Sequence, residues 1–198
     1  MTLPKSLEIG LSSWIIQDGN YPDFQIGNEY KFALEISPRS IQRVEADGTF
    51  LNHIQESEYT FNGKVLFREP RLTVVDVGVL CYHEGEISKE FEPGDFISGD
   101  LYLGVDPFFW FETHAKRRDA PNLIYRWMLN GILLETTEWQ ESINSSGRRL
   151  LSRNEQTKSF KPVGKTDAWN DDNGHAHYIL QCNLLGPACY ESQSHTLY

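Results

Sequence analysis

The sequence predicts an all-β domain with few or no helices, and three observations lead to that fold class. Short segments that alternate apolar and polar residues run from Leu7 to Leu185, and turn-forming residues separate them. No amphipathic helix of comparable clarity occurs among them. Glycines lie inside several strand-like segments and one segment is apolar on both faces, which favours a closed sheet over an open one. We therefore expect about seven or eight mostly antiparallel strands in a barrel-like or OB-like fold.

The N-terminal part of the chain predicts two strands separated by a turn. Residues 7–16 are the first strand, and residues 17–23 include an Asp-Gly pair that suits a tight turn. Residues 29–36 alternate most clearly, with large apolar side chains on one face and mostly charged side chains on the other. Pro38 is expected to end this strand, because proline cannot donate a hydrogen bond to a neighbouring strand.

The middle of the chain predicts three further strands. In residues 58–67, Asn62 and Gly63 mark either a hairpin tip or a bulge. Residues 71–82 are apolar on both faces, as in a central strand or in one that lines a closed barrel. Asp76 and Gly78 interrupt this segment, and the glycine suggests a sharp bend. Residues 96–105 form the next predicted strand.

The C-terminal half predicts a hairpin, a long loop and a last strand. Asn130 and Gly131 stand between two strand-like runs, which favours a type I′ turn. Residues 141–173 are polar and predict a long loop, with a short helix near 149–154. Residues 176–185 alternate again and predict the closing strand, and residues 186–198 predict a tail. We expect residues 1–198 to form a single β-rich domain.

The charge and the cysteine content restrict the function classes. The chain has 18 basic and 28 acidic residues, a net charge of −10, which repels nucleic acid and anionic membranes and attracts basic partners. No apolar stretch is long enough to span a membrane, and residues 1–6 lack the apolar core of a signal peptide. Cys81, Cys182 and Cys189 are an odd number without close spacing, which favours free thiols. We therefore expect a soluble cytoplasmic protein.

His175 and His177 are the candidate metal ligands. They follow Asp and Asn residues, but the spacing does not match a calcium-binding EF-hand loop at either end. Both imidazoles would share a face if both residues lay in a strand, and zinc would then need a third ligand, such as His83 or His53. A turn before the last strand explains the same residues without a metal. We expect neither a metal nor a cofactor.

A cysteine and a group of carboxylates are the two candidates for catalysis. Cys81 follows an apolar run and precedes acidic residues, a setting that raises a thiol pKa, so it is interpreted as a core residue rather than a nucleophile. Asp95, Asp100 and Asp106 alternate with aromatic residues, as in some sites for glycoside hydrolysis. Asp95 and Asp106 also adjoin Gly94 and Pro107, so turns explain them equally well. The sequence has no nucleophile elbow and no phosphate-binding loop.

Two binding surfaces are suggested by composition. Phe108, Phe109 and Trp110 would make an anchor for a protein partner if they were exposed, and would be core residues otherwise. Basic residues gather at Lys116, Arg117 and Arg118 and in the stretch 148–165. These two segments would bind nucleic acid only if they converged on one face that also carries exposed aromatic residues. The acidic net charge makes nucleic acid an unfavourable partner.

These observations favour a non-catalytic, soluble interaction or accessory protein. An acidic, immunity-type partner of a basic protein is one concrete form of that hypothesis. The first alternative is an OB-like protein that binds an oligonucleotide or a small ligand, and the second is a carboxylate-based hydrolase. The interaction hypothesis requires exposed apolar groups, the nucleic-acid hypothesis requires converging basic segments, and the hydrolase hypothesis requires a pocket with paired polar side chains. The oligomeric state is left open.

Overall fold

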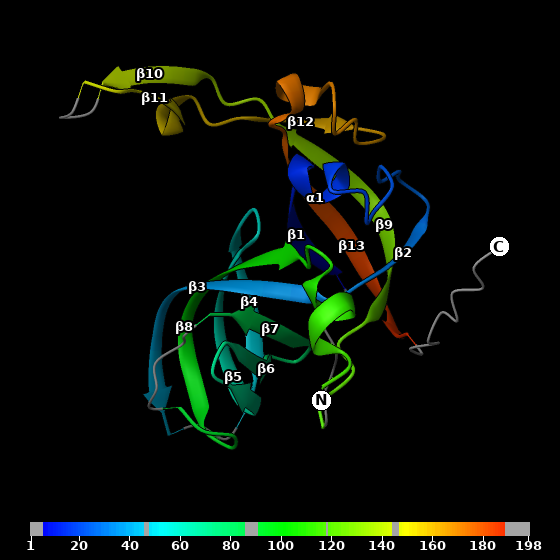
Figure 1. Cartoon of the computed structure of the whole chain (residues 1–198), viewed down its shortest axis with the longest axis vertical. Coiled ribbons are helices and arrows are strands. Elements are labelled where there is room, and N and C mark those ends of the chain that lie inside the picture. The colour runs from blue at the N-terminus through cyan, green and yellow to red at the C-terminus, as the bar shows by residue number, and fades with distance from the viewer. Residues whose placement is uncertain (1–5, 46–47, 86–90, 118, 144–146, 189–198) are drawn as a thin grey trace.

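The computed structural model describes residues 6–45, 48–85, 91–117, 119–143 and 147–188. Within these ranges the protein is almost entirely β, with thirteen strands, one short α-helix and three single-turn helical segments. Figure 1 shows a barrel in the lower part of the view, a second curved sheet above it, and a narrow two-stranded hairpin that projects to the upper left. No helix in the described part of the chain is long and apolar enough to cross a membrane.

Five strands close into a barrel: β3 (Leu34–Val44), β5 (Glu58–Glu69), β6 (Leu72–Asp76), β7 (Leu80–Glu84) and β8 (Phe96–Val105). The antiparallel pairs follow the order β3–β8–β5–β6–β7, and a parallel bridge between Glu35 and Tyr82 joins β7 back to β3. β4 (Phe50–Gln55) pairs with β5 outside this ring. The interior is filled by apolar side chains, among them Ile36, Phe61, Val65, Ile97 and Leu101.

The second sheet combines segments from both ends of the chain. It contains β12 (Phe160–Val163), β9 (Tyr125–Glu135), β13 (His177–Pro187), β1 (Ser6–Ser12) and β2 (Glu29–Phe32). β13 lies between β9 and β1, while β2 and β12 both pair with β9. A parallel bridge between Gly10 and Gly104 connects this sheet to β8, so the barrel and the second sheet share one hydrogen-bonded network.

The buried apolar side chains form two clusters, a main core and a smaller second cluster, and a short helical segment packs into each. α1 (Ser13–Gln17) follows β1 and buries Ile15 and Ile16. η1 (Trp110–His114), a single π-helical turn, packs in a second apolar cluster with Leu72, Val74 and Tyr82. The neighbouring residues Val75 and Cys81 belong to the main core instead. β6 and β7 are therefore buried on both sides, which explains the two apolar faces of residues 71–82.

The prediction of an all-β, barrel-containing fold is confirmed, but there are more strands than the sequence predicts. Residues 7–16 form β1 and then α1, and residues 29–36 are divided at Ala33 between β2 and β3, which pair with different neighbours. Pro38 does not end β3. The pairing of β3 with β8 shifts register between Pro38 and Ser40, and a bulge of this kind accommodates proline.

Residues 71–82 form a hairpin rather than one strand. β6 ends at Asp76 and β7 begins at Leu80, and these two residues face each other across the turn. Gly78 has a φ of 99°, a conformation that favours glycine, and its N–H donates to Asp76 Oδ1 at 2.8 Å. The polar residue and the glycine inside the apolar run therefore mark the turn itself.

Asn130 and Gly131 lie inside β9 and do not form a hairpin tip, so that prediction is wrong. β9 continues through both residues and pairs with β13 along most of its length, with a register shift at this point. Neither residue has the positive φ that a type I′ turn needs. A Cβ on residue 131 would lie 2.2 Å from Gln181 Oε1, so a larger residue here would require the Gln181 side chain to move.

Residues 141–173 are not a structureless loop. β10 (Trp139–Ile143) and β11 (Arg149–Arg153) form a hairpin, followed by η2 (Glu155–Thr157), β12 and η3 (Asp171–Gly174). The helix expected near 149–154 is wrong, because this segment is β11. Neither strand of the hairpin has a buried residue, so no apolar alternation marks a buried face. β13 reaches Pro187, and residues 189–198 of the predicted tail lie outside the described ranges.

Candidate protein-interaction site

The β10–β11 hairpin, which we call the arm, is a two-stranded antiparallel sheet separate from the main sheet. In Figure 1 it projects away from both the barrel and the second sheet. Within the described part of the chain, β10 and β11 pair only with each other, so each strand has an open outer edge. Open strand edges present unpaired backbone N–H and C=O groups to other chains.

The register of the arm places its largest side chains on one face. Residues that lie directly opposite each other point to the same side of a sheet. Three such pairs share a face: Trp139 with Arg153, Glu141 with Leu151, and Ile143 with Arg149. Trp139 and Ile143 of β10 and Leu151 of β11 therefore lie on the same face, which we call the apolar face of the arm. The opposite face carries Gln140, Ser142, Leu150 and Ser152.

The apolar face of the arm lies in water. Ile143 is 71% exposed and Leu151 is 66% exposed. Every residue of β10 is exposed, and in β11 only Arg153 is partly covered. An isolated two-stranded hairpin is at best marginally stable in water, so the position of the arm depends on the contacts at its base.

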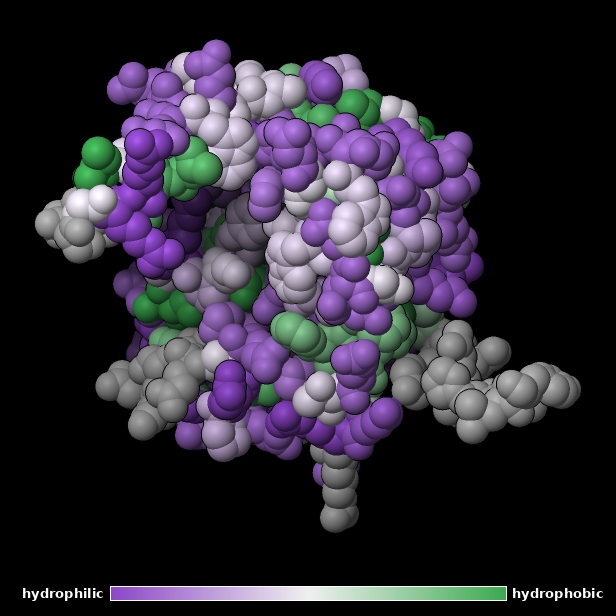
Figure 2. All heavy atoms as spheres, turned by 45° about the horizontal axis from the view of Figure 1, so that its top comes forward, coloured by the Kyte–Doolittle hydropathy of each residue, from purple (hydrophilic) through white to green (hydrophobic). Residues whose placement is uncertain are grey.

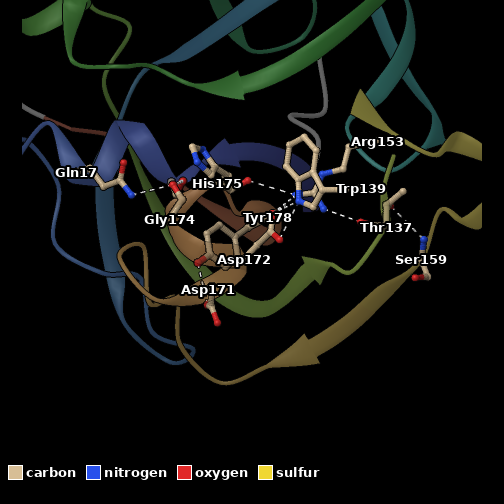
Figure 3. Close-up of polar contacts among 11 residues, drawn as sticks. Gln17, Thr137, Trp139, Arg153, Ser159, Asp171, Asp172, Gly174, His175 and Tyr178 are labelled. Carbon is tan, nitrogen blue, oxygen red and sulfur yellow. Dashed lines mark hydrogen bonds and ion pairs between the residues drawn. The ribbon is translucent and has the colours of Figure 1, made fainter. Parts of the chain in front are cut away.

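Asp172 holds both strands of the arm at their base (Figure 3). Its carboxylate accepts a hydrogen bond from Trp139 Nε1 at 3.0 Å and pairs with Arg153 Nη2 at 2.5 Å. Trp139 belongs to β10 and Arg153 to β11, so one carboxylate links both strands to the body of the protein. Arg153 Nη1 also donates to the carbonyl of Thr137 at 2.7 Å. Hydrogen bonds between charged groups of this kind are the strong ones.

Arg153 and Trp139 also contact each other. The guanidinium carbon of Arg153 lies 4.2 Å from the centroid of the Trp139 ring, in a cation–π arrangement. The His175 ring approaches Trp139 edge-on with centroids 6.3 Å apart, and the His175 carbonyl accepts a hydrogen bond from Arg153 Nη2 at 3.3 Å. We call Trp139, Arg153, Asp172 and His175 the arm root.

The arm root stands on a turn with an unusual backbone. Asp172 and Asn173 have φ angles of 48° and 55°, in the left-handed region that non-glycine residues rarely adopt. Such conformations cost about 1–3 kcal/mol each and persist where neighbouring contacts fix them. Here the carbonyl of Gly174 accepts hydrogen bonds from Ser13 Oγ at 2.8 Å and from Gln17 Nε2 at 2.9 Å.

The start of the same turn is fixed by β13. The hydroxyl of Tyr178 donates to Asp171 Oδ2 at 2.8 Å, and the same oxygen accepts a hydrogen bond from the backbone N–H of Asp167 at 3.1 Å. Tyr178 itself is buried in the main core. The arm root is therefore anchored to α1 and to β13, which are parts of the rigid body of the protein.

Exposed tryptophans lie in the arm root and on the two segments next to its turn, α1 and the residues before η3. Of the chain's five tryptophans, Trp14, Trp139 and Trp169 are exposed, and the other two are buried. Trp169 follows Ala168, whose carbonyl accepts a hydrogen bond from Gln17 Nε2 at 2.7 Å, and Trp14 lies in the same helix as Gln17. Tryptophan is among the residues most enriched at the energetic centres of protein interfaces. The aromatic side chains that sequence reasoning sought at 108–110 are thus found here instead.

A hollow separates the arm from the barrel. Figure 2 looks onto this end of the molecule and shows the arm standing off the body at the left, with the hollow beside it. Lys158 follows β11, and its Nζ pairs with Glu56 Oε2, in the β4–β5 turn, at 2.8 Å. In Figure 1, β11 is the strand of the arm that lies on the barrel side. The hollow is therefore bordered by β11 and by the end of the β4–β5 hairpin.

The aromatic anchor predicted at residues 108–110 is mostly buried. Trp110 lies wholly within the cluster beneath η1. Phe108 is half-buried and stacks on Phe111 with ring centroids 4.6 Å apart. Of the three predicted residues only Phe109 is exposed. This segment therefore does not supply the exposed apolar surface that the interaction hypothesis requires.

The two basic segments do not converge. Lys116 is exposed, the Arg117 guanidinium pairs with the Glu69 carboxylate, and Arg118 lies outside the described ranges. Residues 148–165 lie on the arm and on the segment that follows it, well away from η1 and the residues after it (Figure 1). The arrangement that the nucleic-acid hypothesis requires is therefore not formed by these residues.

The two candidate metal ligands contact different partners. His175 belongs to the arm root, whereas His177 lies in β13 with its Nε2 at 2.8 Å from the Tyr102 hydroxyl. They do not share a strand face, because His175 sits in the turn before β13. Among the described residues, no group of three or more His, Cys, Asp or Glu side chains could hold a metal ion.

The carboxylates considered for hydrolysis are dispersed. Asp95 pairs with Arg43 at 2.7 Å beside the first residue of β8, Asp100 lies in the middle of that strand, and Asp106 follows its end. Only Asp106 is buried. The three side chains therefore do not form the pair that a carboxylate-based hydrolase needs.

The two cysteines in the described ranges are free and buried. Cys81 lies in the main core, as expected, and burial raises the pKa of its thiol. Burial also raises the pKa of Cys182, to about 12. Neither thiol has the lowered pKa of a nucleophile. Cys189 lies outside the described ranges.

A buried polar cluster lies beneath η1. The Asp106 carboxylate contacts the Tyr82 hydroxyl and accepts a hydrogen bond from the backbone N–H of Trp110 at 3.2 Å. Burial raises the pKa of Asp106 to about 6. Burial also raises the pKa of Glu35 to about 7, and the charges of Asp106 and Glu84 add to this shift. Asp106 has no exposed surface, so the cluster does not present a carboxylate pair to a substrate.

Comparison with known proteins yields no match, either to a family model, to a curated protein or to a solved structure.

The arm is the feature that sequence reasoning missed. A weak signal for it exists, because Trp139 and Ile143 share one parity with Glu141, while Gln140 and Ser142 have the other, in a short segment before Gly147. Arg149 and Leu151 continue the same spacing after it.

Proposed function

We propose that the protein is a non-catalytic interaction protein, which binds another protein through the apolar face of the arm and the exposed tryptophans around the arm root. A contrast within the arm carries this proposal. Its root is fixed through Asp172, yet Ile143 and Leu151 lie uncovered in water. An apolar surface that is held in a defined position and left exposed is typical of a binding site.

The residues of the arm are of the types that dominate interface energetics. Burying a leucine or isoleucine side chain contributes about 1.5–3 kcal/mol. Tryptophan and arginine are enriched at interface hot spots, and the arm offers Trp139 with Arg149 and Arg153 on the same face. Because the arm root fixes the arm before binding, less conformational entropy is lost on association.

The charge distribution supports a partner with a basic region. Residues 139–153 contain three Arg and one Glu, a net charge of +2. Because the whole chain has a net charge of −10, the remaining residues together carry a net charge of −12. A strongly acidic body accelerates encounter with a basic protein. We propose accordingly that the chain acts in the cytoplasm as an immunity-type partner that binds a basic protein, and the free, buried cysteines support that compartment.

Co-purification of the tagged chain from its native cells tests this function. We expect the wild-type chain to recover a stoichiometric protein partner, and the double variant Ile143→Ser, Leu151→Ser to lose it. Leu150→Ser is the matched control, because Leu150 is 44% exposed on the same strand but points to the opposite face. Equal recovery of the partner by all three proteins, or no partner for the wild type, would contradict the proposal.

A further inference from the structure

The open edge of β11 is on the barrel side of the arm (Figure 1), where Figure 2 shows the hollow. Along this edge, Arg149 and Leu151 point to the apolar face of the arm, and Leu150 and Ser152 point away from it. A backbone with unpaired groups in front of a hollow is the setting in which peptides add to a sheet as an extra strand. The spacing of the side chains then determines which peptide fits.

We propose that an extended segment of the partner enters this hollow and pairs with β11, with an acidic residue opposite Arg149 and an apolar residue opposite Leu151. This inference rests on the proposed function of the arm, and it adds the binding mode and the chemistry of the segment bound. The segment is short, so it is compatible with a partner whose overall charge is basic.

Charge complementarity selects the acidic residue. Arg149 pairs with Glu141 across the arm at 3.7 Å, but the two side chains are 77% and 61% exposed, and an ion pair so exposed to water is weak. An incoming carboxylate on the other side of β11 gives Arg149 an opposite charge on the same face, and such cross-strand pairs contribute roughly 0.2–1 kcal/mol. Arg153, two positions past Leu151, is already paired with Asp172, so it places a weaker demand on the segment.

The apolar residue follows from the period of the strand. Side chains two positions apart in a strand share a face, so an acidic residue opposite Arg149 puts the residue two positions away opposite Leu151. Leu151 is uncovered on this face, and an apolar side chain there removes it from water. The segment therefore has the pattern acidic–any–apolar when it is written from the tip of the arm toward its root.

A second copy of the chain fits this edge poorly. Antiparallel pairing of β11 with its own copy over the full strand centres on Leu151 and puts Arg149 of one copy opposite Arg153 of the other. Pairing through β10 centres on Glu141 and puts two carboxylates opposite each other. Like charges directly opposite in a sheet are destabilising. The charges of the arm therefore favour a different chain over a symmetric dimer.

A synthetic peptide on the full-length chain tests this binding mode. The probe is the blocked peptide Thr-Glu-Thr-Leu-Thr-Glu-Thr, followed by nuclear magnetic resonance of the nitrogen-15-labelled protein at peptide concentrations up to the millimolar range. We expect saturable shifts of the backbone amides of β11 and unchanged amides in β8. A version with alternate backbone nitrogens methylated keeps every side chain and loses the strand hydrogen bonds, and we expect it to bind about tenfold more weakly or worse.

A charge exchange tests the position of the acidic residue. We expect Arg149→Glu to weaken binding of the Glu peptide about threefold to tenfold. The same variant should bind the peptide in which Lys replaces Glu more tightly than it binds the Glu peptide. Leu150→Ser is again the matched control and should leave both affinities unchanged. Equal affinities of the two peptides for Arg149→Glu would overturn the assignment of an acidic residue to this position.

Three results would overturn the proposal as a whole. The first is no saturable binding of the Glu peptide to the wild-type chain, and the second is equal binding of the methylated peptide. The third is a homodimer in sedimentation that Leu151→Ser dissociates, because the edge would then belong to a second copy. If the methylated peptide binds equally while partner capture still depends on Ile143 and Leu151, the proposed function stands and only strand pairing is wrong.

Discussion

The cluster beneath η1 and the arm are opposite exceptions to the usual division between polar surface and apolar core. Asp106 and His114 are buried, whereas Ile143 and Leu151 are exposed. Buried polar groups need partners within the fold, which Asp106 finds in Tyr82. Exposed apolar groups gain partners only from another molecule. The comparison therefore separates a region that the fold itself completes from one that it leaves open.

The buried cluster is nevertheless incompletely satisfied. Among the described residues, neither ring nitrogen of His114 has a hydrogen-bond partner, and its Nε2 lies 3.9 Å from Glu84 Oε2. Burial lowers the pKa of His114, so the imidazole is held neutral. The apolar packing of Trp110 and Tyr82 in the same cluster offsets the cost of these polar groups.

Two tryptophan substitutions are expected to affect stability very differently in the two regions. Trp110→Ala removes a fully buried side chain, and we expect it to lower the free energy of unfolding by about 3–5 kcal/mol. Trp139→Ala removes a partly exposed side chain whose contacts with Asp172 and Arg153 hold the arm rather than the barrel, and we expect a loss below about 1 kcal/mol. Urea denaturation of both variants measures the difference. Similar losses would show that the arm is part of the cooperative fold.

Asp172→Ala is expected to release the arm while the barrel stays folded. The substitution removes the acceptor shared by Trp139 and Arg153, and a lost charged hydrogen bond costs roughly 1.5–3 kcal/mol. We expect faster amide hydrogen exchange in β10 and β11 and unchanged exchange in β8. Asp95→Ala, which breaks the surface pair with Arg43, serves as the control. Unchanged exchange in the arm would mean that other contacts hold it.

Stability is expected to fall as pH rises from about 4.5 to 7, because burial raises the pKa of Glu35 to about 7. A carboxyl with a raised pKa binds more protons in the folded state across this range, so the protonated form stabilises the fold. Glu35→Gln should remove a decrease of about 2 kcal/mol between pH 5 and pH 8. Asp106 keeps a smaller dependence of the same sign in the variant. Urea midpoints at the two pH values check this, and an equal decrease in both proteins would exclude Glu35.

Leu151→Ser has the smallest expected effect on stability. Its side chain is mostly in water, so we expect the free energy of unfolding to change by less than about 0.5 kcal/mol. The same substitution is expected to weaken partner capture. A clear loss of stability would indicate that Leu151 already packs within the folded chain, which would remove the basis for its proposed role.

The sequence predicted those parts of the fold that bury one face of a strand. β8 coincides with the predicted strand 96–105, and β13 overlaps most of residues 176–185, because their apolar residues alternate against the core. The division at Ala33 was not predictable, since both halves of that segment alternate in the same phase and only their neighbours differ.

The arm was hidden from sequence reasoning for a physical reason. Apart from Trp139 and Arg153 at the base, no described contact covers a face of its strands, so no periodic burial shaped them. Trp110 lies in an aromatic run and Trp139 lies among polar residues, but neither pattern specifies the tertiary contacts that bury Trp110 and leave Trp139 exposed. The turn beneath the arm depends on Ser13, which is 161 positions away from Gly174.

Amide hydrogen exchange of the arm, in the free chain and in the assembly co-purified from native cells, shows whether the arm is covered by the partner. If the apolar face of the arm is the binding surface, the amides of β10 and β11 exchange at least about tenfold more slowly in the assembly, while those of β8 are unchanged. If the arm exchanges equally fast in both states and protection appears only on other surfaces, the arm is not the interaction site.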